Sequence, residues 1–311
     1  MTKDFTVAIP TYNGAERLPK LLDKLRSQLG TESLKWEIIV VDNNSKDNTA
    51  EVIRNYQKSW DLPYGLVYIL EEKQGAAFAR HRAIQAANSD LIGFLDDDNL
   101  PREHWVINAY KFGLEHPEVG AFNGKIHGKY IMPPPPNFER IAAYLAIRDH
   151  GETAHAFAPE RIHLPPGAGL VVRKKAWLDS VPHNPKVLGN TAGKIARGED
   201  YEPLLYMHKA GWKIWYTPDL EIEHEIPPWR LERKYLMNLS QSCGLATYNL
   251  VIINAPAARQ RPVIFLRIIY GNLKRVVKHL LRYNLAGKRD LVSDCELIFL
   301  WGCTVSPFYR F

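Results

Sequence analysis

The sequence predicts an α/β fold in which a mainly parallel sheet carries helices on both faces. Short apolar runs alternate with helical patterns through the first hundred residues, and this alternation is typical of βαβ units. The composition, 46% hydrophobic and 24% charged, is that of a globular protein and excludes a wholly disordered or collagen-like chain. A length of 311 residues is enough for one large or two modest domains with a buried core.

Four apolar runs rich in Val, Ile and Phe are predicted to be the buried strands of this sheet. They are Phe5–Pro10, Trp36–Asp42, Val67–Leu70 and Leu91–Leu95. Three helices are predicted between them. The first has leucines on one face from Leu18 to Leu29 and a proline in its first turn. The other two are Asn48–Tyr56 and Ala76–Asn88.

The pattern is looser from residue 101 to residue 230, which we interpret as the second half of the same domain. The elements predicted there are a helix at Arg102–His116, a strand near Val119–Ile126, a helix near Phe138–Asp149, a strand near Gly169–Arg173 and a helix at Glu199–Ala210. The proline tract Pro133–Pro136 is predicted to be an extended surface loop.

Residues 231–311 are predicted to form a basic, mainly helical C-terminal extension. No acidic residue occurs between Glu232 and Asp290, whereas this interval holds eleven lysines and arginines. The net charge of +6 is therefore a property of this segment, and the first 232 residues are mildly acidic. A basic character confined to one segment does not favour nucleic-acid binding by the whole protein, and no nucleic-acid partner is expected.

The cysteine count and the chain's hydropathy indicate a compartment. Cys243, Cys295 and Cys303 are too few and too scattered for a disulfide framework or a zinc cluster. The N-terminus lacks the apolar segment of a signal peptide. No stretch offers the roughly 20 uncharged apolar residues that span a bilayer. We therefore expect a cytoplasmic protein and not a polytopic membrane protein.

Acidic and amide side chains follow two predicted strands at the point where each strand ends. Asp42 and Asn43 end the second strand, and Asp96, Asp97 and Asp98 follow the fourth. Ligands of open parallel sheets bind beyond the carboxyl ends of the strands. Three adjacent carboxylates repel one another, and a divalent cation such as Mn²⁺ or Mg²⁺, shared with substrate phosphates, would stabilise them. The alternative is a solvated turn in which Asp98 caps the following helix.

Four motifs resemble, in their order and spacing, those of the inverting family 2 glycosyltransferases of GT-A fold. They are Val7–Gly14 (VAIPTYNG), Val41–Thr49 (VDNNSKDNT), Gly75–His81 (GAAFARH) and Phe94–Asn99 (FLDDDN). The resemblance continues more thinly through Gly167–Arg173 and Gly198–Tyr201 to His224. Each motif alone is modest, but the ordered set is specific. The chain also resembles polysaccharide-biosynthesis members of this family of the cyanobacterial hormogonium type.

The resemblance implies that residues 1–100 bind a nucleotide sugar, UDP-linked, and that residues 101–230 bind a glycan or lipid-linked acceptor. It implies that the nucleotide-sugar residues are Pro10, Thr11, Tyr12, Asn13, Asp42, Asn43, Gly75, Arg80, Asp96 and Asp97. It also implies a Mn²⁺ or Mg²⁺ site at Asp98, Asp96 and His224, with Asp98 as the principal ligand. A lone histidine flanked by glutamates is otherwise typical of a surface residue.

Glu199 and Asp200 match the acidic pair at which the family places its catalytic base. Displacement of a nucleoside diphosphate from an anomeric carbon requires the acceptor hydroxyl to lose its proton, and the Asp200 carboxylate would accept it. The metal and Arg80 would offset charge on the leaving diphosphate. The alternative is that the two acids only open the helix that follows, where they suit its dipole.

Three other functions are alternatives at this point. Residues 14–20 (GAERLPK) faintly resemble a signature of sugar-nucleotide pyrophosphorylases, although the glycine-rich loop of that class is absent before them. A dinucleotide-binding oxidoreductase is disfavoured because Gly167-Ala-Gly169 precedes a predicted strand and does not open a helix. A non-catalytic nucleotide-sugar-binding scaffold is disfavoured by the joint presence of Asp42, Asp98 and Asp200.

An amphipathic helix is predicted within residues 262–283. Its apolar residues recur at spacings of three and four: Val263, Leu266, Tyr270, Leu273, Val277 and Leu280. Basic residues lie off this stripe, at Lys274, Arg275, Lys278 and Arg282. One interpretation is peripheral contact with an anionic membrane, on the inner face of the plasma membrane. The alternative is a helix packed on the acceptor-binding half, with a solvated basic face.

Overall fold

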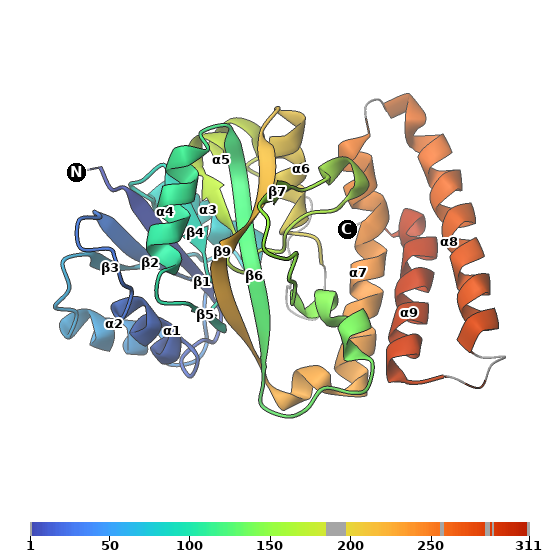
Figure 1. Cartoon of the computed structure of the whole chain (residues 1–311), viewed down its shortest axis with the longest axis horizontal. Coiled ribbons are helices and arrows are strands. Elements are labelled where there is room, and N and C mark those ends of the chain that lie inside the picture. The colour runs from blue at the N-terminus through green and yellow to red at the C-terminus, as the bar shows by residue number, and fades with distance from the viewer. Residues whose placement is uncertain (1, 185–196, 256–257, 284–286, 288, 310–311) are drawn as a thin grey trace.

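The computed structural model of the chain shows an α/β body and, beside it, a C-terminal extension of three long helices (Figure 1). It describes all residues except 1, 185–196, 256–257, 284–286, 288 and 310–311. The predicted α/β class and the helical character of the described part of the extension are therefore confirmed.

The strands of the described residues form one nine-stranded sheet in the order β3-β2-β1-β4-β8-β6-β9-β5, and β7 pairs with β9. Their bounds are β1 Phe5–Thr11, β2 Trp36–Asp42, β3 Gly65–Leu70, β4 Leu91–Phe94, β5 Asn99–Pro101, β6 Val119–Tyr130, β7 His155–Ala156, β8 Val171–Arg173 and β9 Lys213–Ile226. The four strands predicted in the first hundred residues all occur, and β1 to β4 pair in parallel.

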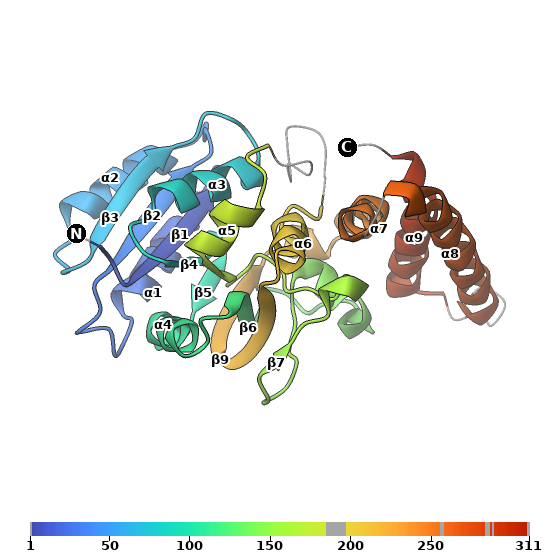
Figure 2. The same ribbon diagram turned by 90° about the horizontal axis from the view of Figure 1, so that it is seen from above.

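Helices cover both faces of the sheet, as predicted. They are α1 Leu18–Arg26, α2 Thr49–Lys58, α3 Ala76–Ala86, α4 Trp105–Glu115, α5 Lys174–Ser180 and α6 Tyr201–Lys209. Seen from above, α1 and α4 lie on the opposite side of the sheet from α3 and α5 (Figure 2). Side chains of β1 supply both layers, because Phe5, Val7 and Ile9 pack in the core under α1 and Ala8 packs in the core under α3.

The parallel register brings the carboxyl ends of three strands to one edge of the sheet. Thr11 at the end of β1 lies opposite Asp42 at the end of β2, and Ala8 lies opposite Phe94, the last residue of β4. The acidic triplet that begins at Asp96 therefore leaves the sheet beside the end of β1. This is the edge at which open parallel sheets bind ligands.

The helix predicted near Phe138–Asp149 is wrong. Two short 3-10 turns, Phe138–Arg140 and Ala142–Leu145, occupy most of this segment. The second turn ends at Ala146, whose backbone is left-handed at φ 62°. The chain then extends, and Arg148 exchanges two backbone hydrogen bonds with Ile126 of β6. Pairing with the sheet thus replaces helix propagation.

The strand β9 extends through the segment that precedes the proline pair at 227–228. Its last residues alternate, with Leu220, Ile222, His224 and Ile226 buried and the intervening glutamates on the other face. Antiparallel pairing with β5 sets His224 opposite Asn99, which follows the acidic triplet. The register of β9 is therefore the reason that His224 and Asp98 meet.

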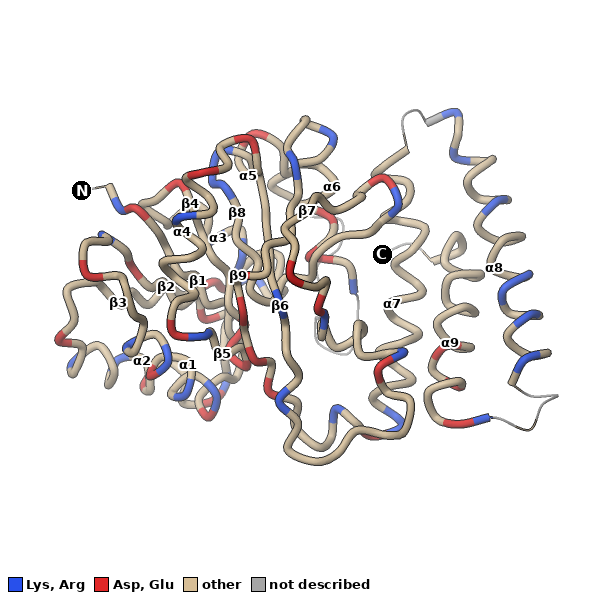
Figure 3. The backbone as a smooth tube through the Cα atoms, in the orientation of Figure 1, with Lys and Arg blue, Asp and Glu red and all other residues tan. Residues whose placement is uncertain are grey.

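The extension consists of α7 Arg233–Asn254, α8 Arg261–Tyr283 and α9 Leu291–Val305. The helix α7 packs on the body, where its Ala246 and Leu250 join the core under α6. The helix α9 lies between α7 and α8 (Figure 1). Among the described helices, the segment Leu291–Phe308 alone is long and apolar enough to cross a membrane by length and composition, and half of it is buried inside the protein. The outermost helix, α8, carries lysines and arginines and no acidic residue (Figure 3).

Candidate active site

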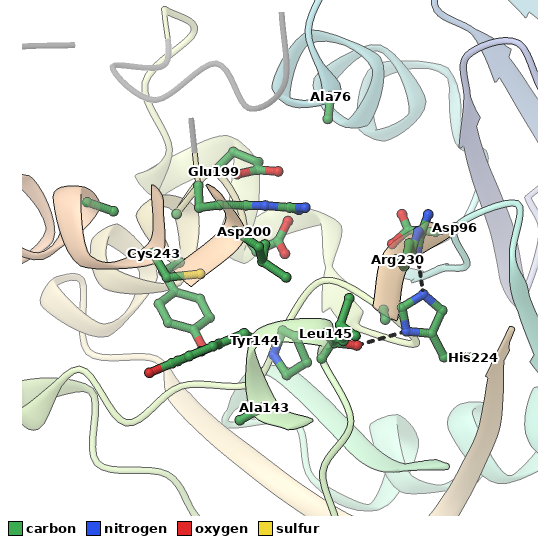
Figure 4. A pocket seen from close by; sticks show the side chains of 18 of the residues that line it. Ala76, Asp96, Ala143, Tyr144, Leu145, Glu199, Asp200, His224, Arg230 and Cys243 are labelled. Carbon is green, nitrogen blue, oxygen red and sulfur yellow. Dashed lines mark hydrogen bonds between the residues drawn. The ribbon is translucent and has the colours of Figure 1, made fainter. Parts of the chain in front are cut away.

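A cavity of about 880 Å³ opens at the carboxyl edge of the sheet, between the body and the extension. The predicted site residues that line it are Pro10, Thr11, Tyr12, Asn43, Arg80, Asp96, Asp97, Asp98, Glu199, Asp200 and His224. Residues that lie far apart in the sequence of the body therefore line one cavity (Figure 4). Three predicted nucleotide-site residues, Asn13, Asp42 and Gly75, are not part of the lining.

Asp42 and Asn43 have structural hydrogen bonds that hold the rim of the cavity. The buried Asp42 carboxylate accepts from the Ser45 backbone N–H at 2.9 Å and from the Tyr68 hydroxyl at 2.9 Å. The Asn43 side chain donates to the backbone carbonyl of Lys73 at 2.6 Å and accepts from the Gly75 N–H at 2.7 Å. These contacts fix the loop that leads into α3.

Each carboxylate of the acidic triplet has its own arginine partner, from a different element. Asp97 accepts two hydrogen bonds from Arg17, at 2.7 and 2.9 Å, and one from the Thr11 hydroxyl at 2.6 Å. Asp96 lies 3.3 Å from the Arg80 guanidinium. Burial, opposed by Arg80, raises the pKa of Asp96 to about 6. The three arginines thus supply positive charge to the triplet, for which the sequence predicted a divalent cation.

The third member, Asp98, meets both an imidazole and an arginine. Its Oδ2 lies 3.4 Å from Nε2 of His224 and 2.7 Å from the guanidinium of Arg230. Arg230 also donates to His224 Nε2 at 2.9 Å, and His224 Nδ1 lies 2.9 Å from the Leu145 carbonyl (Figure 4). Although burial acts in the opposite direction, His224 and Arg230 hold the pKa of Asp98 well below its usual range.

Asp98 and His224 fit a divalent metal ion. The Leu145 carbonyl can only accept, so Nδ1 carries a proton, and withdrawal of Arg230 from Nε2 would leave there the lone pair that a metal ligand needs. Within the described residues no group of three or more His, Cys, Asp or Glu side chains is arranged so that it could hold a metal ion by itself. The described residues therefore offer this pair to a metal ion, and oxygen atoms of water or of a bound ligand would complete its coordination. Asp96 contacts Arg80 instead, which does not support the expectation that it shares the ion.

Arg80 links Asp96 to Asp200 across the cavity. This buried guanidinium pairs with Asp200 Oδ1, while Asp200 Oδ2 accepts from the Gly167 backbone N–H at 3.0 Å. Asp200 stands at the N-cap position of α6 but makes no capping hydrogen bond. Its carboxylate therefore faces the cavity, and its contacts differ from those expected of an acid that only opens a helix.

Glu199, the neighbour of Asp200, is buried, and its Oε2 has no hydrogen-bond partner in the described structure. Burial, reinforced by the negative charge of Asp200, raises the pKa of Glu199 to about 7. The two acids thus differ in environment, because Asp200 is paired with Arg80 and has 26% of its side-chain surface exposed. Asp200 is therefore the more exposed of the two acids and the one that is held by an arginine.

Arg17, Arg230 and the role of Gly167 were not predicted from the sequence. A Cβ atom on Gly167 would lie 2.6 Å from Asp200 Oδ1 and 2.7 Å from Arg80 Nη2, so only glycine allows this approach. Arg230 lies in the 3-10 turn Pro228–Leu231, directly after β9. Its proximity to His224 in the sequence is a signal that could have found it. Arg17 precedes α1 and gives no such signal.

Comparison with known proteins identifies a sequence family. The model of the family described as Glycosyl transferase family 2 matches residues 6–175. Glycosyltransferase AglE of Haloferax volcanii is 37% identical to this chain over 101 residues, which cover 32% of this chain and 32% of AglE. The chain thus spans about a third of the length of this curated relative.

Solved structures share the fold over nearly the whole chain. Mannosyltransferase PcManGT from Pyrobaculum calidifontis, in complex with GDP-Man and Mn²⁺, has a TM-score of 0.63 at 19% identity, over 99% of this chain and 88% of that chain. TarS 1-349 of S. aureus in complex with UDP has a TM-score of 0.52 at 17% identity, over 97% of this chain and 92% of that chain. These likenesses show the GT-A fold that the sequence motifs predicted.

Proposed function

The chain belongs to glycosyl transferase family 2, and we propose that it moves a sugar from a nucleotide-sugar donor to a hydroxyl group of a glycan or lipid-linked acceptor, with inversion, in polysaccharide biosynthesis. The observation that carries the proposal is the placement of Asp200. Its carboxylate pairs with Arg80 in the cavity that Asp98 and His224 also line, and Figure 4 shows Asp200 apart from His224. A pyrophosphorylase is not favoured by the family to which the chain belongs.

We propose that the donor lies along the edge formed by Pro10, Thr11 and Tyr12 and that its diphosphate points toward Asp98. The cavity is continuous between these residues. PcManGT was solved with GDP-Man and TarS with UDP, and we propose UDP for this chain. Asn13, Asp42 and Gly75 are then supports of the nucleotide site, because their contacts are with the protein.

Asp98 and His224 would hold Mn²⁺ or Mg²⁺ together with the donor diphosphate. The ion would stabilise the negative charge that develops on the leaving diphosphate. Because Arg230 binds both side chains in this structure, it must withdraw from them for the ion to bind. Its guanidinium would then be available to the diphosphate, to which arginine donates readily.

Asp200 would act as the general base. An acceptor hydroxyl bound beside it would pass its proton to Oδ2 as the oxygen attacks the anomeric carbon from the face opposite the diphosphate. One such displacement inverts the anomeric centre. Arg80 and the Gly167 N–H hold the carboxylate in position, and a positioned base contributes about 10²–10⁴ to the rate.

We place the reaction in the cytoplasm. Cys243, Cys295 and Cys303 are all free, and the last two are buried, a pattern that suits a reducing compartment. The cavity continues past Tyr144 and Cys243 toward α9, where Phe299 and Cys303 line it. This apolar continuation supports an acceptor with an apolar portion.

A screen of nucleotide sugars tests the proposal. The purified chain is incubated with UDP- and GDP-sugars and simple sugar acceptors, with and without Mn²⁺, and the released nucleotide and pyrophosphate are measured. We expect UDP release that depends on Mn²⁺ and is lost in the Asp200→Asn variant. Pyrophosphate as the product, or no nucleotide release from any donor, would contradict the proposed activity.

A further inference from the structure

The outward face of α8 is an apolar stripe that is largely exposed. Its side chains are largely exposed: Val263, Leu266, Tyr270, Leu273, Val277 and Leu281, each between 45% and 67%. Leu281 takes the place predicted for Leu280, which is only partly exposed. Contiguous exposed apolar side chains mark a surface that binds something.

The opposite face of α8 is already packed. Asn272 and Val276 are buried. The ring centroids of Phe265 and Phe308 lie 5.3 Å apart. Near its C-terminal end, His279 lies 3.2 Å from Glu296 of α9. The alternative of a helix that buries its predicted stripe on the acceptor-binding half is therefore wrong, because the helix uses other residues for packing.

Positive charges border the stripe. Arg267, Lys274, Lys278 and Arg282 are exposed on α8, and none of them forms an ion pair within the described structure. The Lys274 ammonium lies 4.3 Å from the centre of the Tyr270 ring, so its stem follows the apolar surface. With no acidic residue on α8, the whole outer face is apolar and basic (Figure 3).

We propose that the outer face of α8 docks on an anionic lipid bilayer. The spacing of the stripe would also suit pairing with a second copy of the helix. A second copy, however, would bring Arg267 and Lys274 against other unpaired cations, and like charges in this arrangement repel. Anionic headgroups complement those cations, while the stripe enters the interface between headgroups and acyl chains.

Docking of α8 would bring the cavity close to the bilayer. Asn272 and Arg275 of α8 line the same cavity as Asp200. If the proposed function holds, an acceptor anchored in the bilayer would reach the base along this path, and this consequence rests on the proposed function. The docking itself does not, because it follows from the surface of α8 alone.

The test is co-sedimentation of the full chain with vesicles. One set contains phosphatidylcholine alone and the other adds phosphatidylglycerol, each at 50 and 500 mM salt. We expect binding to the anionic vesicles at low salt and release at high salt. Lys274→Gln with Lys278→Gln should weaken this binding about 25-fold, or about fivefold per cation. Leu266→Glu with Leu273→Glu should abolish it.

Matched controls come from α4, which lies on the body. Lys111 and Leu114 are also exposed there, and Lys111→Gln or Leu114→Glu should leave vesicle binding unchanged. Circular dichroism melts and donor binding confirm that every variant is folded. The docking proposal would be overturned by a folded wild-type chain that ignores anionic vesicles, or by one that binds neutral and anionic vesicles equally. A dimer dissolved by the Leu266→Glu, Leu273→Glu pair, without lipid binding, would also overturn it in favour of the second copy.

Discussion

Two contacts hold the Asp200 carboxylate in the cavity. Arg80 pairs with its Oδ1, and the Gly167 N–H donates to its Oδ2. The Asp200→Asn side chain has nearly the same shape as the carboxylate, but its amide cannot accept the proton of an acceptor hydroxyl. We expect donor affinity within a few-fold of the wild type and turnover lower by about 10²–10⁴. Single-turnover kinetics with titrated donor measures both, and Asp179→Asn on the exposed part of α5 is the control. Native turnover in Asp200→Asn would place the base elsewhere.

Arg230 competes with a metal ion for Asp98 and His224. Without donor, Arg230→Gln should therefore bind Mn²⁺ about tenfold more tightly, which corresponds to about 1.4 kcal/mol. Asp98→Asn should lose Mn²⁺ binding and, with it, Mn²⁺-dependent UDP binding. Electron paramagnetic resonance of free Mn²⁺ measures the first effect and calorimetry the second. Unchanged or weaker Mn²⁺ binding in Arg230→Gln would contradict the competition.

The protonation of Glu199 is expected to make the free energy of unfolding depend on pH. Its pKa is raised from 4.5 to about 7 by burial and by Asp200. Between these values the folded chain holds a proton that the unfolded chain has lost, so the free energy of unfolding falls as pH rises from about 4.5 to about 7. Glu199→Gln cannot lose this proton. We expect its Tm to exceed that of the wild type by a few degrees at pH 8 and to approach it near pH 4.5. An equal difference at both pH values would contradict the assignment.

Sequence patterns at the residue scale predicted the acids better than their partners. The positions of Asp96–Asp98 and Glu199–Asp200 were predictable because they follow strand ends or match motifs. Arg80 was predicted as a site residue but not as the partner of Asp96 and Asp200. Arg17 and Arg230 were not predicted, because they come from parts of the chain distant from the acids they pair with. Repulsion within the triplet and the family resemblance both predicted a metal ion, whereas the fold also supplies a guanidinium for each carboxylate of the triplet.

At the scale of elements, periodicity succeeded where one face of a helix or both faces of a strand are buried. The strand Trp36–Asp42 was predicted to the residue because every one of its side chains is buried. It failed at Phe138–Asp149, where the pairing of Arg148 with Ile126 is a long-range interaction. The residues before His224 belong to the strand Lys213–Ile226, in which half-buried glutamates alternate with buried residues and weaken the apolar signal.

The helices α7 and α8 should respond differently to the same truncation of a leucine. Leu239 of α7 is 1% exposed and Leu266 of α8 is 66% exposed. Leu239→Ala should lower the free energy of unfolding by about 2–5 kcal/mol, whereas Leu266→Ala should change it by less than about 0.5 kcal/mol. Urea unfolding followed by fluorescence provides both values. Equal losses would mean that α8 buries its stripe within the folded chain.

At the scale of the whole molecule, the cavity lies where a mildly acidic body meets a basic extension. The fold class of the body was predictable from the first hundred residues, because strand–helix alternation of that spacing has few solutions. The order in which α7, α9 and α8 pack was not, since each is amphipathic or apolar and their contacts are not local. The extension closes one side of the cavity with residues of all three helices.

The proposed mechanism is a single displacement at the anomeric carbon, with Asp200 as the base. The most direct test is proton NMR of the product formed from an α-linked nucleotide sugar by the wild-type chain. The anomeric coupling constant of the transferred sugar reports its configuration. A single displacement gives a β-linked product, which is the result we expect. An α-linked product would contradict it, because retention requires a second displacement or a different mechanism.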